Sequence, residues 1–180
     1  MITASIKLAT RWSGHSRFGW LTTLVITFIG AVLRFANLAN PKVLVFDETY
    51  YVKDAYTLGL FGSERKWPEN ANAAFEAGDI SGFLDSAAYV VHPPFGKWVI
   101  WLGMQPFGAE SPFGWRFATA LLGTLMIPLV IVIARKLIGS NFFAAVAGLL
   151  MALEGLSITL SRTAILDGIL AFFVVLGFYF

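Results

Sequence analysis

Long hydrophobic runs alternate with short charged segments along this chain. The first run, residues 18–36, follows a basic N-terminal segment of residues 1–17, and further runs occupy residues 116–134, 142–160 and 169–180. About 20 mostly apolar residues are enough for a helix to cross a bilayer. We therefore predict an all-α integral membrane protein with about four transmembrane helices, the fourth of which is truncated by the end of the sequence.

A secretory signal sequence is the alternative interpretation of the first run. Its uncharged part, residues 18–33, is at the long end for the hydrophobic region of a signal, and no cleavage site of small residues follows before Arg34. We favour a retained span. Because Lys and Arg gather on the cytoplasmic side, residues 1–17 and the turn at 135–141 are expected to be cytoplasmic. The turn at 161–168 is then extracytoplasmic.

The segment of residues 37–115 is predicted to be a long extracytoplasmic loop. It contains nine of the eleven acidic residues and five of the thirteen basic residues, which gives it a net charge of −4. Helical spacing of apolar residues at 52–60 indicates a helix lying in the membrane interface. A second interfacial helix is expected at 98–107, which is too short to span, with Pro94 at its start. Asn70 is expected to cap a short helix between them.

Composition supports the membrane assignment and excludes several classes of protein. Hydrophobic residues make up 57% of the chain and charged residues 13%, whereas soluble domains are about half apolar and a quarter charged. The net charge of +2 is too small to indicate nucleic-acid binding. The chain has no cysteine, which excludes disulfides, a thiolate nucleophile and a cysteine-based metal site.

Five charged residues are predicted to meet at the extracytoplasmic face. Asp47 and Glu48 follow the first span, and Arg34, Arg116 and Arg162 lie at the outer ends of spans. Arginines can hold a phosphate through paired hydrogen bonds, and a carboxylate can take a proton from a hydroxyl. This combination suits a lipid-phosphate donor. The alternatives are an ordinary solvated loop start and arginines that extend to the bilayer surface.

Four further residues are weaker candidates. Glu154 lies within a hydrophobic run, where charge is costly, so it is either functional or paired with Arg162 or Lys97. His92 precedes two prolines and is expected to be extended. No second ligand stands near His92 at metal-binding spacing, so no metal site is predicted. Asp167 follows Arg162 in the last external turn.

Four short blocks, in this order, carry a resemblance to a known family. They are Phe-Asp-Glu-Thr-Tyr-Tyr at 46–51, His-Pro-Pro-Phe-Gly-Lys-Trp at 92–98, Phe-Gly-Trp-Arg-Phe at 113–117, and Ser-Arg-Thr-Ala-Ile-Leu-Asp at 161–167. With them the sequence resembles the protein O-mannosyltransferases that use polyprenyl-phosphate mannose, most of all the actinobacterial branch. Members of that family are several times longer, so the chain is expected to be an N-terminal fragment.

The resemblance implies a multi-pass plasma-membrane glycosyltransferase of the GT-C class. Such an enzyme moves mannose from polyprenyl-phosphate mannose to Ser or Thr hydroxyls of exported proteins, with inversion at C1. The resemblance also implies that Asp47 is the base and that Glu48 supports the acceptor or the donor. Contacts to the lipid phosphate are implied for Arg34 and Arg116, and Arg162 is a further candidate. The supporting candidates are His92, Lys97, Glu154 and Asp167.

No organic cofactor is expected, and assistance by a divalent cation is left open. The expected partners are the lipid-linked donor, exported acceptor proteins and the bilayer, without nucleic acid. A related GT-C enzyme with another polyprenyl-phosphate sugar or a lipid acceptor is an alternative, as is a non-catalytic membrane protein. The missing helices would close the donor cavity, so activity of these 180 residues alone is also left open.

Overall fold

The structure, a computed structural model, describes residues 17–180, and their regular secondary structure is helical. One isolated β-bridge, between Arg65 and Ala87, is the exception within this range. The predicted all-α class is thereby confirmed, while the predicted cytoplasmic segment of residues 1–17 falls almost wholly outside the described part. The helices are α1 (Arg17–Phe35), α2 (Glu48–Phe61), α3 (Ala71–Glu76), α4 (Phe95–Phe107), α5 (Pro112–Ile138), α6 (Asn141–Leu153), α7 (Gly155–Ser161) and α8 (Leu166–Tyr179).

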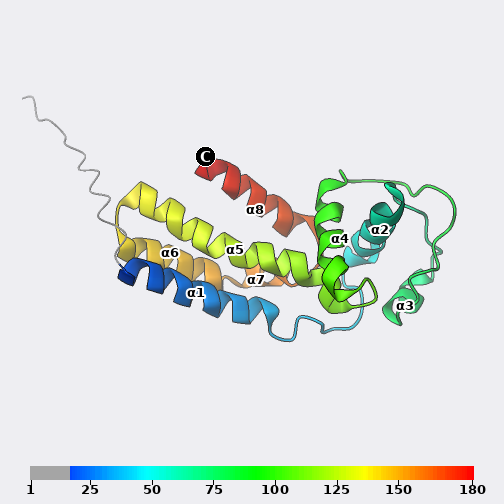
Figure 1. Ribbon diagram of the computed structural model, residues 1–180, viewed down its shortest axis with the longest axis horizontal. Coiled ribbons are helices and arrows are strands. Elements are labelled where there is room, and N and C mark those ends of the chain that lie inside the picture. The colour runs from blue at the N-terminus through cyan, green and yellow to red at the C-terminus, as the bar shows by residue number, and fades with distance from the viewer. Residues whose placement is uncertain (1–16) are drawn as a thin grey trace, which may run out of the picture.

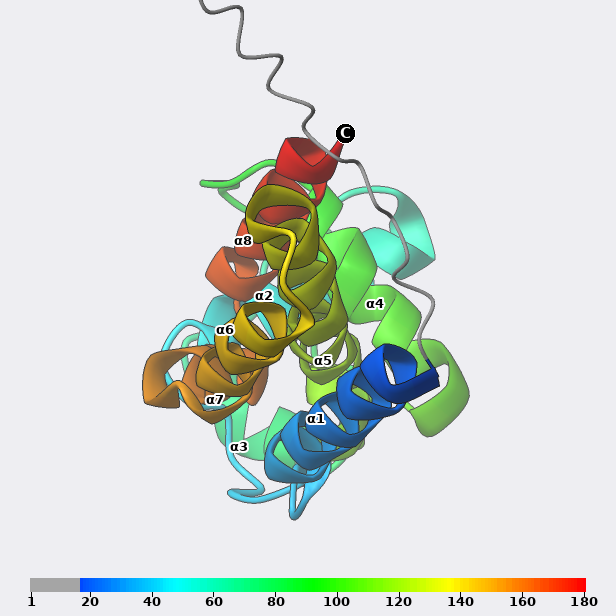
Figure 2. The same ribbon diagram turned by 90° about the vertical axis from the view of Figure 1, so that its left-hand side faces the viewer.

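The molecule has an elongated helical bundle with a smaller helical cap at one end (Figure 1). Helices α1, α5 and α6 contact one another along the bundle, and α8 packs on another side of α5 (Figure 2). The cap consists of α2, α3 and α4, all of which come from the predicted external loop. The chain leaves the bundle after α1, builds the cap, and returns through α5.

Helix α5 is the longest element and connects the cap to the bundle. It has 27 residues and is the one helix in the described range that is long and apolar enough by itself to cross a membrane. It extends beyond the predicted 116–134 at both ends. Pro112 fits the first turn, where its missing N–H costs nothing, and Gly139 ends the helix with a φ of 70°.

The predicted span at 142–160 is broken. Helices α6 and α7 meet at Glu154 with a bend of 58°. The Glu154 carboxylate accepts hydrogen bonds from the backbone N–H groups of Leu156 and Ser157 and so caps the start of α7. The expected ion pair of Glu154 with Arg162 or Lys97 is therefore wrong, because this carboxylate is exposed and used as a helix cap.

Arg34 fills the other side of the same break. Its side chain is buried, and its Nη1 and Nη2 atoms donate to the carbonyl oxygens of Ala152 and Met151, each at 3.1 Å. Its other bonds go to Gly30 of its own helix and to the hydroxyls of Ser157 and Ser161. The last carbonyls of α6, which have no intrahelical partners, are thus satisfied by a cation.

Apolar side chains form two buried clusters, one that joins the cap to the bundle and one within the bundle. Close approach of α4 and α5 is required at Gly103, where an added Cβ would lie 2.9 Å from the carbonyl oxygen of Gly114. The cap cluster consists of Leu44, Tyr51, Val52, Ala55, Phe75, Ile100, Met104, Trp115, Ala164, Ile165 and Ile169. The bundle cluster consists of Ile26, Ile127, Ile131, Ala134, Ala144 and Ala152.

Replacing Arg34 by Leu in the full-length protein should lower the free energy of unfolding by about 3 kcal/mol, because an unsatisfied buried polar group costs about 1–3 kcal/mol. Thermal unfolding in detergent would measure the loss. Lys42→Leu is the control, since Lys42 is exposed in the loop after α1. An unchanged Tm in Arg34→Leu, combined with poorer use of a lipid-phosphate donor, would contradict the structural role of Arg34.

Candidate functional site

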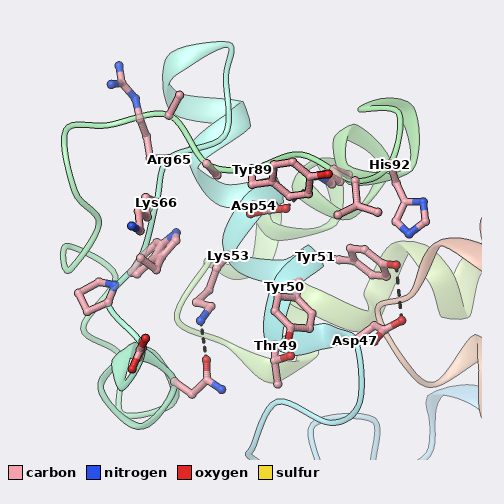
Figure 3. Close-up of a pocket in the computed structure, with 18 residues that line it drawn as sticks. Asp47, Thr49, Tyr50, Tyr51, Lys53, Asp54, Arg65, Lys66, Tyr89 and His92 are labelled. Atoms are coloured by element: carbon pink, nitrogen blue, oxygen red, sulfur yellow. Dashed lines mark hydrogen bonds and ion pairs between the residues drawn. The ribbon is translucent and has the colours of Figure 1, made fainter.

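A cavity of about 980 Å³ opens in the cap beside the start of α2. Its walls come from α2, from the segment that follows α2, and from the extended segment that leads to His92. Figure 3 shows Asp47, Tyr51 and His92 together at one end, with Arg65 and Lys66 at the other. The cavity therefore connects a carboxylate to a cationic region along one face of the cap.

Asp47 is the acidic residue at the end of the cavity where Tyr51 and His92 lie. It directly precedes α2 and is partly buried, and its Oδ2 lies 3.5 Å from the hydroxyl of Tyr51, which donates to it. Burial raises the pKa of Tyr51, and the negative charges of Asp47 and Asp167 raise it further, so the tyrosine keeps its proton. The His92 ring contacts Tyr51 edge-on, with the ring centroids 5.6 Å apart.

Glu48, the neighbour of Asp47, faces away from the cavity into the protein. Its carboxylate is fully buried and pairs with Arg116 through two bonds of 2.7 Å, to Nε and Nη2. The same carboxylate accepts the backbone N–H groups of Val45 at 3.0 Å and of Ala164 at 2.7 Å. The two adjacent acids therefore occupy different environments, and Glu48 has no oxygen directed at a ligand.

Arg116 uses its remaining donors on the loop that follows α1. Nη1 donates to the carbonyl oxygens of Leu38 and Pro41, and Nη2 donates to that of Val43. Together with the two bonds to Glu48, these contacts occupy all five N–H groups of the guanidinium. The expected contact of Arg116 with a lipid phosphate stays a prediction, but in this arrangement no donor of Arg116 is left for it.

Arg162 contacts the end of α1. Its Nη1 donates to the carbonyl oxygens of Leu33, Arg34 and Ala36, and Nη2 donates to that of Asn37. These are carbonyls of a helix C-terminus, where positive charge is favourable. Unlike Arg34 and Arg116, Arg162 is only partly buried, and its Nε has no partner among residues 17–180.

Lys97 lies in a buried charge cluster in the cavity wall. Its Nζ is 2.9 Å from Oδ2 of Asp54 and 3.1 Å from Oε1 of Glu64, and the lysine side chain is 1% exposed. Burial raises the pKa of Asp54, although the bond from Lys97 acts in the opposite direction. Lys97 was a predicted supporting candidate, but its partners Asp54 and Glu64 could not be predicted, because nothing in the spacing of α2 and the following loop shows that they converge.

Of two other residues near the site, Asp167 was a predicted supporting candidate and Lys53 was not. Lys53 lies in the cavity wall and donates to the side-chain oxygen of Asn72, which holds the α3 region against α2. Burial lowers the pKa of Lys53. Asp167 lies in the first turn of α8 and is exposed, and its charge acts on Tyr51 without lining the cavity. Within residues 17–180, no three His, Asp or Glu side chains form a metal-binding group.

The neighbouring substitutions Asp47→Asn and Glu48→Gln should differ sharply in their effect on stability. Glu48→Gln replaces a carboxylate that accepts two bonds from a buried arginine, so we expect a loss of about 3–5 kcal/mol. Asp47→Asn should change stability by less than about 0.5 kcal/mol, as for other sites with few contacts. Thermal unfolding of both full-length variants tests this, and equal Tm values would contradict the division of roles.

The difference in stability between Asp54→Asn and the wild type should shift in favour of the variant as the pH rises from 4 to 7. Because the pKa of Asp54 is raised by folding, the wild type loses stability as this group ionises, whereas asparagine does not titrate. The matched control is Asp79→Asn. Hydrogen bonds from Ser81 lower the pKa of Asp79, so ionisation of Asp79 stabilises the wild-type protein as the pH rises over the same range. Asp79→Asn lacks this gain. Tm profiles against pH that move the same way for both variants would contradict the prediction.

Comparison with known proteins identifies the family. The family described as "Dolichyl-phosphate-mannose-protein mannosyltransferase" matches residues 80–180. Proteins named polyprenol-phosphate-mannose–protein mannosyltransferase are similar: that of Mycobacterium tuberculosis is 39% identical over 89% of this chain and 28% of its own length. The one from Corynebacterium glutamicum is 32% identical over 91% of this chain and 29% of its own length.

The similarity extends to a human protein and covers only part of every relative. Human Protein O-mannosyl-transferase 1 is 29% identical over 87% of this chain and 20% of its own length. The chain thus spans less than a third of the curated relatives that it matches. No solved structure matches it. Since the family match covers more than half of its residues, the chain belongs to the dolichyl-phosphate-mannose-protein mannosyltransferase family.

Proposed function

We propose that this chain carries the catalytic carboxylate of an enzyme that transfers mannose from polyprenyl-phosphate mannose to Ser or Thr hydroxyls of proteins. The observation that carries the proposal is the position of Asp47. It is the acid at the end of the cavity, and no cation lies within ion-pair distance of it in the described residues. The names of the relatives supply the donor and the class of acceptor.

In the proposed reaction Asp47 acts as the general base. The acceptor hydroxyl forms a bond to C1 of mannose while the bond from C1 to the phosphate oxygen breaks. The hydroxyl proton passes to Asp47, and the polyprenyl phosphate leaves as an anion. Displacement from the opposite side inverts the configuration at C1. A base in such a position contributes about 10²–10⁴ in rate, and the Tyr51 hydroxyl fixes the orientation of the carboxylate.

Glu48 and Arg116 are proposed to position Asp47 rather than to contact substrate. Their pair fixes the first residue of α2 to α5 and to the turn before α8. Of the three arginines expected to bind phosphate, Arg162 is the one that we propose for this role. It keeps unused donors, and it lies two residues before Ala164, which is bonded to Glu48. The lipid phosphate would thus lie near the start of α2.

We further propose a multi-pass plasma-membrane enzyme of the GT-C class with the cap on the extracytoplasmic side. Helix α5 would form one complete span and the bent pair of α6 and α7 another. Helices α1 and α8 are shorter and apolar. Large apolar side chains are exposed on α1, including Leu24 at 64% and Phe28 at 69%, as lipid-facing residues would be. We propose that α1 and α8 belong to two further spans and that the N-terminus is cytoplasmic.

Asp47→Asn in the full-length protein should reduce transfer of labelled mannose from polyprenyl-phosphate mannose to a Ser/Thr-rich peptide by at least about a hundredfold. Membranes adjusted to equal protein levels are the sample, and Asp79→Asn, an exposed acid outside the cavity, is the control. Undiminished transfer would rule out Asp47 as the base. With the wild type, label on lipid and none on peptide would favour a lipid acceptor instead.

A further inference from the structure

The segment of residues 87–91 begins at an isolated β-bridge and continues outside the helices, and we call its unpaired backbone groups the free edge. It begins at the β-bridge between Arg65 and Ala87, where Lys66 N–H donates to the Ser86 carbonyl at 2.9 Å and Ala88 N–H donates to the Glu64 carbonyl at 3.0 Å. In an antiparallel pair, the residue between two such bonds directs its own N–H and C=O to the opposite side. The backbone groups of Ala87 therefore face away from the segment to which its neighbours are bonded.

The free edge continues toward the proposed base. Tyr89, Val90 and Val91 make no backbone hydrogen bond with any other residue of the described chain, and no helix or strand includes them. Tyr89 is 91% exposed and Val91 69% exposed. Alternation in extended chain brings the N–H and C=O of Tyr89 and Val91 to the same side as those of Ala87. The two prolines after His92 have no N–H and end the edge.

The position of this edge relative to the cavity indicates what would use it. Ala87, Ala88, Tyr89 and Val91 all line the cavity that contains Asp47. In Figure 3, Tyr89 lies between Arg65 at one end and His92 at the other, so the edge runs along the length of the cavity. The segment leads to His92, whose ring contacts Tyr51, the residue that donates to Asp47.

We propose that the acceptor polypeptide binds as an added β-strand along residues 87–91, with its reacting hydroxyl beside Asp47. This inference rests on the proposed function, which makes the acceptor a protein. A row of unpaired N–H and C=O groups at regular spacing is complementary to an extended polypeptide, which offers the same groups in the same spacing. Recognition through the backbone would accept many sequences around the modified residue, and an acceptor segment would have to be unfolded to bind.

Ester-for-amide replacement in the acceptor peptide tests the proposal with the unaltered full-length enzyme. Each replacement removes one N–H donor and leaves the side chains in place. In a bound strand, only alternate N–H groups face the edge, so replacements at alternate positions should raise the acceptor KM by about two- to tenfold, while those between them leave it unchanged. The KM of the donor should stay constant throughout. An equal effect at all positions, or none at any, would overturn strand addition.

A variant of the enzyme connects the effect to this edge. Tyr89→Pro removes the outward N–H of Tyr89 and is compatible with extended backbone, and Tyr89→Ala removes the same side chain but keeps the N–H. We expect the acceptor KM to rise severalfold more in Tyr89→Pro than in Tyr89→Ala, with the donor KM equal in both. If ester replacements at alternate peptide positions raise the acceptor KM of Tyr89→Pro as much as they raise that of the wild type, the assignment to residues 87–91 is overturned. Another edge would then be the binding site.

The two hypotheses fail in different ways. If the unmodified peptide receives no mannose from the wild-type enzyme, the proposed function is wrong. If the unmodified peptide is a good acceptor but no alternation appears, the proposed function stands and strand addition is wrong. Where the remaining part of the full-length chain or a second copy covers the edge, Tyr89→Pro would change thermal stability or oligomeric state instead of the acceptor KM, and this result would also overturn the proposal.

Discussion

The buried pair of Glu48 and Arg116 is the interaction on which the arrangement of this molecule depends. Its two side chains make hydrogen bonds to the loop after α1 and to the turn before α8, while Glu48 itself begins α2 and Arg116 belongs to α5. A charge removed from water must be matched by partners in good geometry, or it destabilises the fold. Here every donor and acceptor is matched, so four separate segments are fixed around one point.

The same pair explains how two adjacent acids acquire different roles. Successive residues at the start of a helix point in directions about 100° apart. Glu48 can therefore enter the interior while Asp47 faces the cavity. Phe46, directly before them, has a φ of 51°, a conformation that is rare for a bulky residue and is retained only where the surroundings determine it. The backbone is thus held in a strained turn that places the Glu48 carboxylate in the interior and Asp47 in the cavity wall.

Much of the fold could be predicted from the sequence because hydrophobic periodicity is a local signal. Helices α2, α3 and α4 were expected within the loop, and the acidic motif was expected beside the first span. The roles of the arginines could not be predicted in the same way. An arginine at the end of a span has the same local sequence whether its donors meet a phosphate or backbone carbonyls. Arg34 serves a helix break that only the packing of α1 against α6 and α7 creates.

Charges in the cavity wall are arranged so that Asp47 differs from its neighbours. Asp54 and Glu64 share the buried ammonium group of Lys97, whose single positive charge offsets part of their negative charge. Asp47 accepts only the hydroxyl of Tyr51, a neutral donor that orients it without neutralising it. A carboxylate paired with a cation would be a weaker base, because the cation favours its ionised form. Asp47 has no cation within ion-pair distance among residues 17–180 and lies beside Tyr51 and His92, which is why we propose it as the acid that accepts a proton from a bound hydroxyl.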